Sequence, residues 1–219
     1  MDLERDGSIN KSSLSDQIFS VLLGRITNLV LKPGQRINLG KLKDEFGVSN
    51  APIREALYRL SQEKLIVVKP RIGYFVVEIT FDEVRELFAA RNTLETYALR
   101  EGMGAIPREA LAGLRSRTIE LKGDKALPGR QNLLDRIDVE LHKELIVRSC
   151  GNRFIIGFYE SISYFGAIIR HLNLRGDSDI AEHLAMIDSI LEGDLEQAES
   201  ALILHLRNAE EMTLSGFRL

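Results

Sequence analysis

The chain has 219 residues, 44% of them hydrophobic, and its 29 Lys and Arg against 32 Asp and Glu give a formal net charge of −3. This composition suits a globular protein with one large core or two smaller ones. No apolar run reaches the roughly 18 residues of a membrane span, and the first ten residues lack the apolar core of a secretory signal. Both absences predict a cytoplasmic protein that does not enter a membrane, and the single cysteine, Cys150, excludes an intrachain disulfide.

The stretch over residues 41–65 predicts two short helices joined by a tight turn. Gly47 supplies the left-handed position that ends the first helix. Ser49 or Asn50 can then cap the second helix, whose first turn accommodates Pro52. The apolar positions of the two helices are Leu42 and Phe46, then Ile53, Leu57 and Leu60 at helical spacing.

A β-hairpin is predicted next along the chain. Residues 66–68 and 74–76 are β-rich, and the segment between them, Lys69-Pro70-Arg71-Ile72-Gly73, has the composition of a turn with a basic tip. Two helices, a tight turn and a hairpin together predict a winged helix-turn-helix, which is a DNA-binding module.

Arg54 leads the candidates for base recognition, because it faces outward near the start of the second helix, where an arginine can bond guanine bidentately. Asn50 could read an adenine or a phosphate. The residues better suited to the DNA backbone are Lys41, Lys43, Lys69 and Arg71. A solvated basic surface is the alternative, but residues 25–71 hold ten Lys and Arg against four Asp and Glu. Positive charge is thus concentrated where a DNA-binding module needs it.

A second, acidic domain is predicted to follow. Up to residue 79 the chain has 12 Lys and Arg against nine Asp and Glu, and beyond it 17 against 23. Thr80 and Glu83 form a capping box that opens a long helix reaching about Gly102. Further helices are predicted at about 107–122, 131–149, 153–172, 178–192 and 194–212. We therefore expect a winged helix-turn-helix domain over residues 1–79 and an all-helical bundle over residues 80–219.

Three of the four histidines can meet in such a bundle. Asp138 and His142 are spaced i, i+4 and so lie on one face of one helix. His183 lies near the start of a later helix, and His205 lies in the last one. One carboxylate and three imidazoles suit Zn²⁺, Ni²⁺, Mn²⁺ or Fe²⁺ and leave one or two positions for water or a ligand. The alternative for each histidine is an ordinary core residue with a satisfied hydrogen bond.

Four motifs follow one another in the N-terminal part of the chain, Leu-Lys-Pro-Gly (31–34), Phe-Gly-Val-Ser (46–49), Pro-Ile-Arg-Glu-Ala-Leu (52–57) and Arg-Ile-Gly-Tyr-Phe-Val (71–76). In this order they give the chain a resemblance to the GntR superfamily of bacterial transcription regulators. It implies that Arg54 contacts operator bases and that Gly73 of the wing approaches the minor groove. Asn50 departs from the family, which commonly has an arginine there. The expected DNA-binding residues are Lys41, Lys43, Ser49, Asn50, Arg54, Arg71 and Gly73.

The C-terminal half is similar to the FCD ligand-binding domain of the FadR subgroup. Its metal pattern is an Asp-x-x-x-His helix with two later histidines, which this chain fills with Asp138, His142, His183 and His205. The resemblance implies a divalent transition metal, Zn²⁺ or Ni²⁺ ahead of Mn²⁺ or Fe²⁺. Arg91 is expected to clamp an acidic effector, the alternative being a pair with Glu95 within the helix. Asn152 is expected to cap a helix first and to face the pocket second.

The two sites together predict a metabolite-responsive regulator. One winged helix contacts too few bases to select an operator in a genome, so we expect a homodimer on a palindrome of double-stranded DNA. A small organic acid or sugar acid is expected to displace water from the metal and to release a repressor from its operator. A metal-sensing regulator and a regulator with a purely structural metal are the alternatives. Enzymatic activity is not expected, because no general acid or base can be assigned beside the ligand set.

Overall fold

The computed structural model describes residues 13–123, 127–172 and 177–218. Residues 1–12, to which the prediction about a secretory signal applies, lie outside the described residues. The chain divides into two compact units, Met1–Glu78 and Ile79–Leu219. The predicted fold class is confirmed, since the chain is mainly helical and the small sheet belongs to the N-terminal unit. No helix among the described residues is long and apolar enough to cross a membrane.

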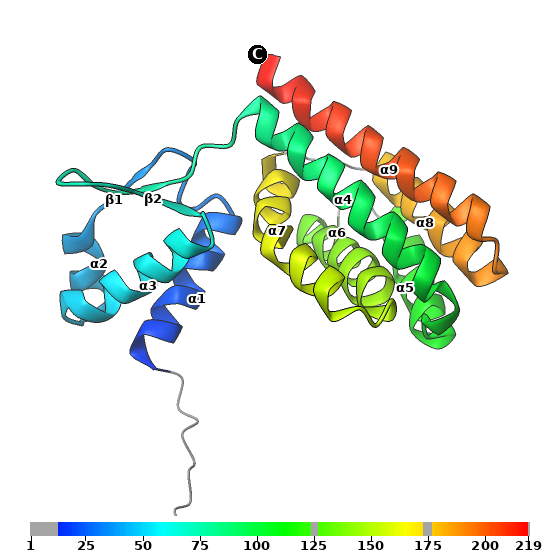
Figure 1. The fold of residues 1–219 in the computed structure, drawn as a ribbon, viewed down its shortest axis with the longest axis horizontal. Helices are drawn as coiled ribbons and strands as arrows, with labels where there is room; N and C mark the ends of the chain where they lie inside the picture. Colours follow the sequence, from blue (N-terminus) through cyan, green and yellow to red (C-terminus); the bar gives the residue numbers. More distant parts are fainter. Residues whose placement is uncertain (1–12, 124–126, 173–176, 219) are drawn as a thin grey trace, which may run out of the picture. The chain divides into compact units, whose positions relative to one another are not determined.

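The described part of the first unit combines helices with a small sheet (Figure 1). Its elements are α1 (Leu14–Thr27), β1 (Arg36–Ile37), α2 (Leu39–Phe46), α3 (Asn50–Gln62), β2 (Ile66–Lys69) and β3 (Gly73–Val76). Helix α2 ends at Gly47, whose φ of 65° is left-handed as predicted. Ser49 is the N-cap of α3, although its side chain makes no capping hydrogen bond. The fully buried residues of α3 include Ile53, Leu57 and Leu60, so the predicted helix-turn-helix is formed.

Helix α1, which the sequence patterns above did not single out, packs against α3 to form the core of this unit. It begins with a capping box in which Ser13 and Asp16 exchange hydrogen bonds between side chain and backbone. Leu22 and Ile26 of α1 are fully buried. Arg59 of α3 forms an ion pair with Asp16 of α1, with 2.5 Å between Nη1 and Oδ1.

The wing is a three-stranded antiparallel sheet with the strand order β1-β3-β2. The predicted hairpin pairs β2 with β3 as far as Lys69 and Gly73, and the two-residue β1 pairs with the other edge of β3. At the tip, the Arg36 guanidinium donates to the backbone oxygen of Ile72 at 2.7 Å. Gly73 has a φ of 138°, which side-chain-bearing residues rarely adopt. Strand β1 was not predicted. Its residue Arg36 links this strand to the tip of the wing through the hydrogen bond to Ile72.

The second unit is an all-helical bundle over its described residues, as predicted. Its elements are α4 (Phe81–Gly102), η1 (Met103–Ala105), α5 (Arg108–Gly123), α6 (Arg130–Val139), η2 (Glu140–Val147), α7 (Arg153–Leu172), α8 (Asp177–Glu192), α9 (Leu195–Ser215) and η3 (Gly216–Arg218). The capping box of Thr80 and Glu83 starts α4 as the sequence predicts. The helix predicted over residues 131–149 is instead α6 continued by the π-helix η2.

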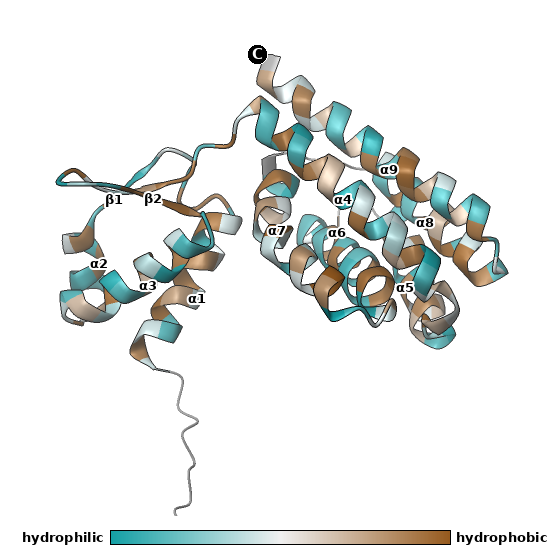
Figure 2. Ribbon diagram, in the orientation of Figure 1, coloured by the Kyte–Doolittle hydropathy of each residue, from teal (hydrophilic) through white to brown (hydrophobic). Residues whose placement is uncertain are grey.

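Helix α4 is the element around which this bundle packs. It contacts α9, η2 and α7, while α8 contacts α9 and α5. Figure 2 shows apolar and polar residues alternating along α4 and α9, as expected for helices with one buried face. At the end of α4, a Cβ on Gly102 would lie 2.5 Å from the backbone nitrogen of Cys150. Glycine therefore permits the end of α4 to touch the backbone that follows η2.

Candidate metal centre and nucleic-acid interface

Four potential metal ligands from different helices meet in the interior of the bundle. Helix α6 contributes Asp138, η2 contributes His142, α8 contributes His183 and α9 contributes His205. All four are buried, and Asp138 is the most exposed at 6%. One ligand atom from each lies within 4.8 Å of the other three. The fold therefore brings together the four side chains that the sequence predicts as a set.

The spacing of these atoms matches that of ligands around one ion. Nε2 of His142 lies 3.1 Å from Nε2 of His205 and 3.4 Å from Nε2 of His183. Oδ1 of Asp138 lies 3.8 Å from Nε2 of His142 and 3.8 Å from Nε2 of His183. Ligand atoms bound about 2.0–2.1 Å from a tetrahedral ion lie about 3.3 Å from one another. The donor set therefore fits a divalent transition metal.

Two of the imidazoles make a hydrogen bond to a carboxylate through Nδ1, the nitrogen that faces away from the cluster. Nδ1–H of His142 donates to Oε2 of Glu95 at 2.6 Å, and Nδ1–H of His205 donates to Oε2 of Glu182 at 3.0 Å. An ionised carboxylate only accepts hydrogen bonds, so each neutral ring keeps a lone pair on Nε2. Two such lone pairs 3.1 Å apart repel each other, whereas a cation between them binds both. The chemistry of the cluster favours a metal over an ordinary core.

Glu95 also joins the cluster to Arg91. Nε of Arg91 donates to Oε1 of Glu95 at 2.7 Å, so the pair expected as the alternative for Arg91 is formed. Burial alone would raise the pKa of Glu95, but the charge of Arg91 and the hydrogen bonds from Arg91 and His142 outweigh it and lower the pKa to about 2. Sequence reasoning missed the bond from Glu95 to His142. A signal existed, because Glu95 shares the buried stripe of α4 with Phe88 and Leu99, and a buried carboxylate requires a partner.

Arg170 of α7, which the sequence did not single out, holds Asp138. Its Nη1 donates to Oδ2 of Asp138 at 2.9 Å, while Oδ1 faces the histidines. Burial alone would raise the pKa of Asp138, but the charges of Arg170 and Arg91 lower it well below its usual range. Asp138 therefore stays ionised, with one oxygen directed at the cluster and the other held by Arg170.

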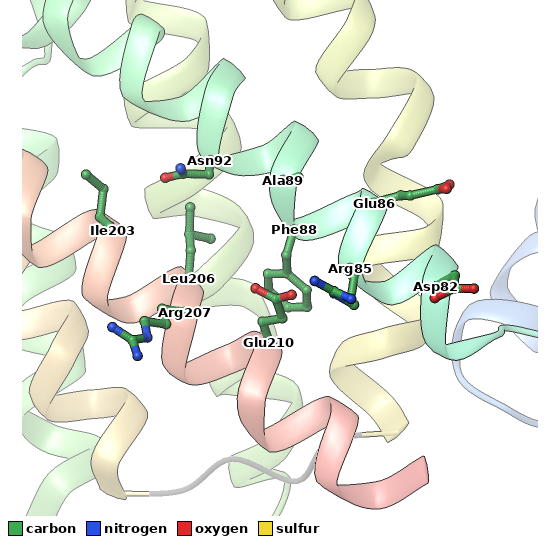
Figure 3. Close-up of a pocket in the computed structure, with 10 residues that line it drawn as sticks. All are labelled: Asp82, Arg85, Glu86, Phe88, Ala89, Asn92, Ile203, Leu206, Arg207 and Glu210. Atoms are coloured by element: carbon green, nitrogen blue, oxygen red, sulfur yellow. The ribbon is translucent and has the colours of Figure 1, made fainter.

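A cavity of about 170 Å³ adjoins the cluster and is lined by Asp138 together with residues such as Arg91 and Arg170. A larger groove of about 530 Å³ lies between α4 and α9, with charged side chains that include Arg85 and Glu210 (Figure 3). None of the four clustered residues lines that groove. Of these two hollows, the cavity of about 170 Å³ is the one that lies beside a proposed metal ligand.

Asn152 lies just before α7. Its Oδ1 accepts from the backbone N–H of Phe154 at 3.0 Å and of Ile155 at 3.4 Å, which is the capping contact expected of it. Asn152 does not line the cavity beside the cluster. His171, the fourth histidine, lies on α7 with Nε2 3.4 Å from Asp135, and it is not part of the four-residue ligand set.

The winged helix presents its predicted DNA-binding residues to solvent. The exposed ones are Lys41, Lys43, Ser49, Asn50, Arg54 and Arg71, and Gly73 is half-buried. No described residue forms an ion pair with the four cations of this set. By contrast, Arg25 is paired with Glu45 and Arg59 with Asp16 inside the unit. The unpaired cations of α2, α3 and the wing are free to meet phosphates and bases.

A winged helix-turn-helix with unpaired cations, in a chain that also forms a helical bundle with a buried ligand set, defines a transcriptional regulator. The family model described as bacterial regulatory proteins, gntR family, matches residues 14–76, and the FCD domain model matches residues 86–208. The chain belongs to the gntR family of bacterial regulatory proteins and carries a C-terminal FCD domain. It is a transcription regulator and not an enzyme.

Proteins similar to this chain include transcriptional regulators and a solved FCD domain. The HTH-type transcriptional regulator YdhC of Bacillus subtilis (strain 168) is 28% identical over 198 residues, which cover 88% of this chain and 87% of YdhC. The gluconate operon transcriptional repressor of Bacillus licheniformis is 29% identical over 154 residues, covering 70% of this chain and 62% of the repressor. Among solved structures, the Zn²⁺-bound FCD domain of TM0439 is 31% identical with a TM-score of 0.57, covering 64% of this chain and 96% of that domain.

Proposed function

We propose that the chain is a metabolite-responsive repressor of the FadR subgroup, which binds a palindromic operator as a homodimer in the cytoplasm. A small organic acid or sugar acid is the proposed effector, bound at a divalent metal in the C-terminal unit. The similarity to a repressor of the gluconate operon supports the repressor role, and the similarity to a Zn²⁺-bound FCD domain supports the metal.

The convergence of three imidazole Nε2 atoms and one carboxylate oxygen carries this proposal. The proposed ligands are Asp138, His142, His183 and His205. Zn²⁺ and Ni²⁺ suit three imidazoles best, and Mn²⁺ and Fe²⁺ also accept this set. A divalent ion held there keeps one or two positions open for an oxygen of the effector. Arg91 is proposed to hold the effector's acidic group, because its guanidinium lines the adjoining cavity.

The proposed operator contacts follow from the exposed residues of the winged helix. Arg54, with Asn50 and Ser49 at the start of α3, would enter the major groove. Phosphate contacts are assigned to Lys41, Lys43 and Arg71, and Gly73 of the wing is proposed to approach the minor groove. Two such units are needed to read enough bases for selectivity against a genome.

Control of DNA binding requires two arrangements of the bundle with different affinities for the effector. The hydrogen-bonded chain from Arg91 through Glu95 to His142 gives a physical link between the effector cavity and the metal ligands. An acid that draws Arg91 toward the cavity changes the support of His142 and thereby the packing of α4. The effector can then weaken operator binding by the ratio of its affinities for the two arrangements.

Two substitutions test this division of labour. Arg54→Ala should weaken binding to duplexes selected by the wild-type protein from a random pool about 10- to 100-fold, with metal content unchanged. His183→Ala should lose the metal, measured by elemental analysis, and abolish release of DNA by acids. His171→Ala is the matched control, since this histidine lies outside the cluster. Equal damage to both functions by either test substitution would contradict the proposal.

A further inference from the structure

The cavity of about 170 Å³ beside Asp138 has several cationic side chains in its lining. Its lining contains three cationic side chains, Arg91, Lys143 and Arg170, against the single carboxylate of Asp138. Such an imbalance raises the local concentration of anions and disfavours neutral ligands. The hydroxyl-bearing residue Tyr159, which is buried, also lines the cavity and adds a hydrogen-bonding group.

Two arginines that line the cavity have unsatisfied donors. Nη2 of Arg91 and Nε of Arg170 are buried and have no hydrogen-bond acceptor among the described residues. Each guanidinium already donates another N–H, to Glu95 and to Asp138 respectively. Buried N–H groups without acceptors are costly, so a ligand carboxylate that accepts from both would relieve them. One acidic group of the ligand is therefore expected next to Asp138.

Lys143 of η2 is the third cation of the same lining. Its side chain is 26% exposed, and Nζ lies 3.6 Å from Oε1 of Glu160. Arg148 approaches the same oxygen more closely, at 3.1 Å, through a hydrogen bond. Glu160 thus has its stronger partner in Arg148, and the Lys143 ammonium keeps donors for another acceptor. A ligand with a single acidic group, held by the two arginines, leaves Lys143 without a ligand partner.

We infer that the effector is a short diacid, with one acidic group between Arg91 and Arg170 and the other at Lys143. The inference rests on the proposed function, because it specifies the ligand of the same site. Lys143 is the residue that distinguishes a diacid from a monoacid, since the two arginines and the metal ligands serve both equally. A cavity of this volume holds several water-sized groups, which suits a short carbon skeleton.

A matched pair of acids tests the inference on the metal-loaded full chain. Malate and 2-hydroxybutyrate have the same number of carbons and the same 2-hydroxy acid group. Malate has a carboxylate where 2-hydroxybutyrate has its terminal methyl group. Isothermal titration calorimetry should show malate binding about tenfold tighter or more, the value of one charge-assisted hydrogen bond. Lys143→Met should bring malate to the affinity of 2-hydroxybutyrate and leave the affinity of 2-hydroxybutyrate unchanged.

Arg148→Met is the control, because it removes a cation that shares Glu160 but does not line the cavity. It should keep the preference for malate, and both variants should keep the metal content and melting temperature of the parent. Equal binding of the two acids, a preference that survives Lys143→Met, or one that is lost equally in Arg148→Met would each overturn the diacid inference and leave a carboxylate effector standing. Absence of binding by both acids and by a panel of sugar acids would overturn the proposed function as well.

Discussion

Replacing Glu95 by Gln perturbs the hydrogen-bonded link between Arg91 and His142 with almost no change of shape. Glu95 is fully buried and accepts from both neighbours, at 2.7 Å from Arg91 and 2.6 Å from His142. An amide keeps one acceptor and turns an NH₂ group toward a donor, so one hydrogen bond is lost. The guanidinium also loses its compensating charge.

The pKa of Glu95 sets the size of the effect. It falls from an ordinary value of 4.5 to about 2 because Arg91 and His142 outweigh the effect of burial. At 1.36 kcal/mol per pKa unit this corresponds to about 3 kcal/mol of stability at neutral pH. Because the folded pKa is the lower one, this stability is present above pH 4.5 and is lost as the pH falls toward 2. Loss of the support for His142 should also weaken metal binding about 10- to 100-fold.

Urea unfolding of the metal-free protein at several pH values, together with competition against a chelator, measures the two effects. Glu95→Gln should lower the free energy of unfolding by about 3 kcal/mol at pH 7 and remove the pH dependence that Glu95 contributes in acid. Glu211→Gln is the control, because it breaks the exposed Arg207–Glu211 pair of the same i, i+4 spacing, worth roughly 0.5 kcal/mol. A variant that loses stability but keeps wild-type metal affinity would refute the role of Glu95 in orienting His142.

Three further changes probe other parts of the chain. Gly102→Ala should lower the melting temperature of the bundle by several degrees in a thermal scan, because its Cβ would lie 2.5 Å from the backbone nitrogen of Cys150. Arg36→Ala should weaken DNA binding several-fold in fluorescence anisotropy without unfolding the protein, since the wing tip loses its bond to Ile72. Chelation should lower the melting temperature of the wild type by mass action and leave that of His183→Ala unchanged.

Periodicity and local motifs account for the parts of the fold that could be predicted. The turn at Gly47, the buried stripe of α3 and the capping box at Thr80 depend on residues close together in sequence, and all are present. Helix α1 has a comparable signal in Ser13 and Asp16, although it is not among the predicted elements. Strand β1, with two residues, is too short for alternation to reveal it.

In the candidate metal site, too, some features could be predicted from the sequence and others could not. Its four ligands could be proposed from residue type, helical spacing and the family resemblance. The contacts that support these ligands could not be proposed, because Glu95 lies 47 residues from His142 and Arg170 lies 32 residues from Asp138. The π-helical turn that carries His142 leaves no mark in apolar spacing either, since it differs from an α-helix in hydrogen-bond register. Contacts of this kind depend on how helices pack.

The way Arg170 holds Asp138 has a consequence for metal selectivity. With Oδ2 engaged by the guanidinium, Asp138 can offer an ion a single oxygen, through Oδ1. Ca²⁺ takes six to eight oxygen ligands and Mg²⁺ prefers oxygen in an octahedral shell, and three imidazoles suit neither. The abundant hard cations of a bacterial cell are therefore at a disadvantage at this cluster, and Arg170 reinforces the bias by preventing bidentate coordination. A scarce transition metal can occupy the same four side chains without competition from them.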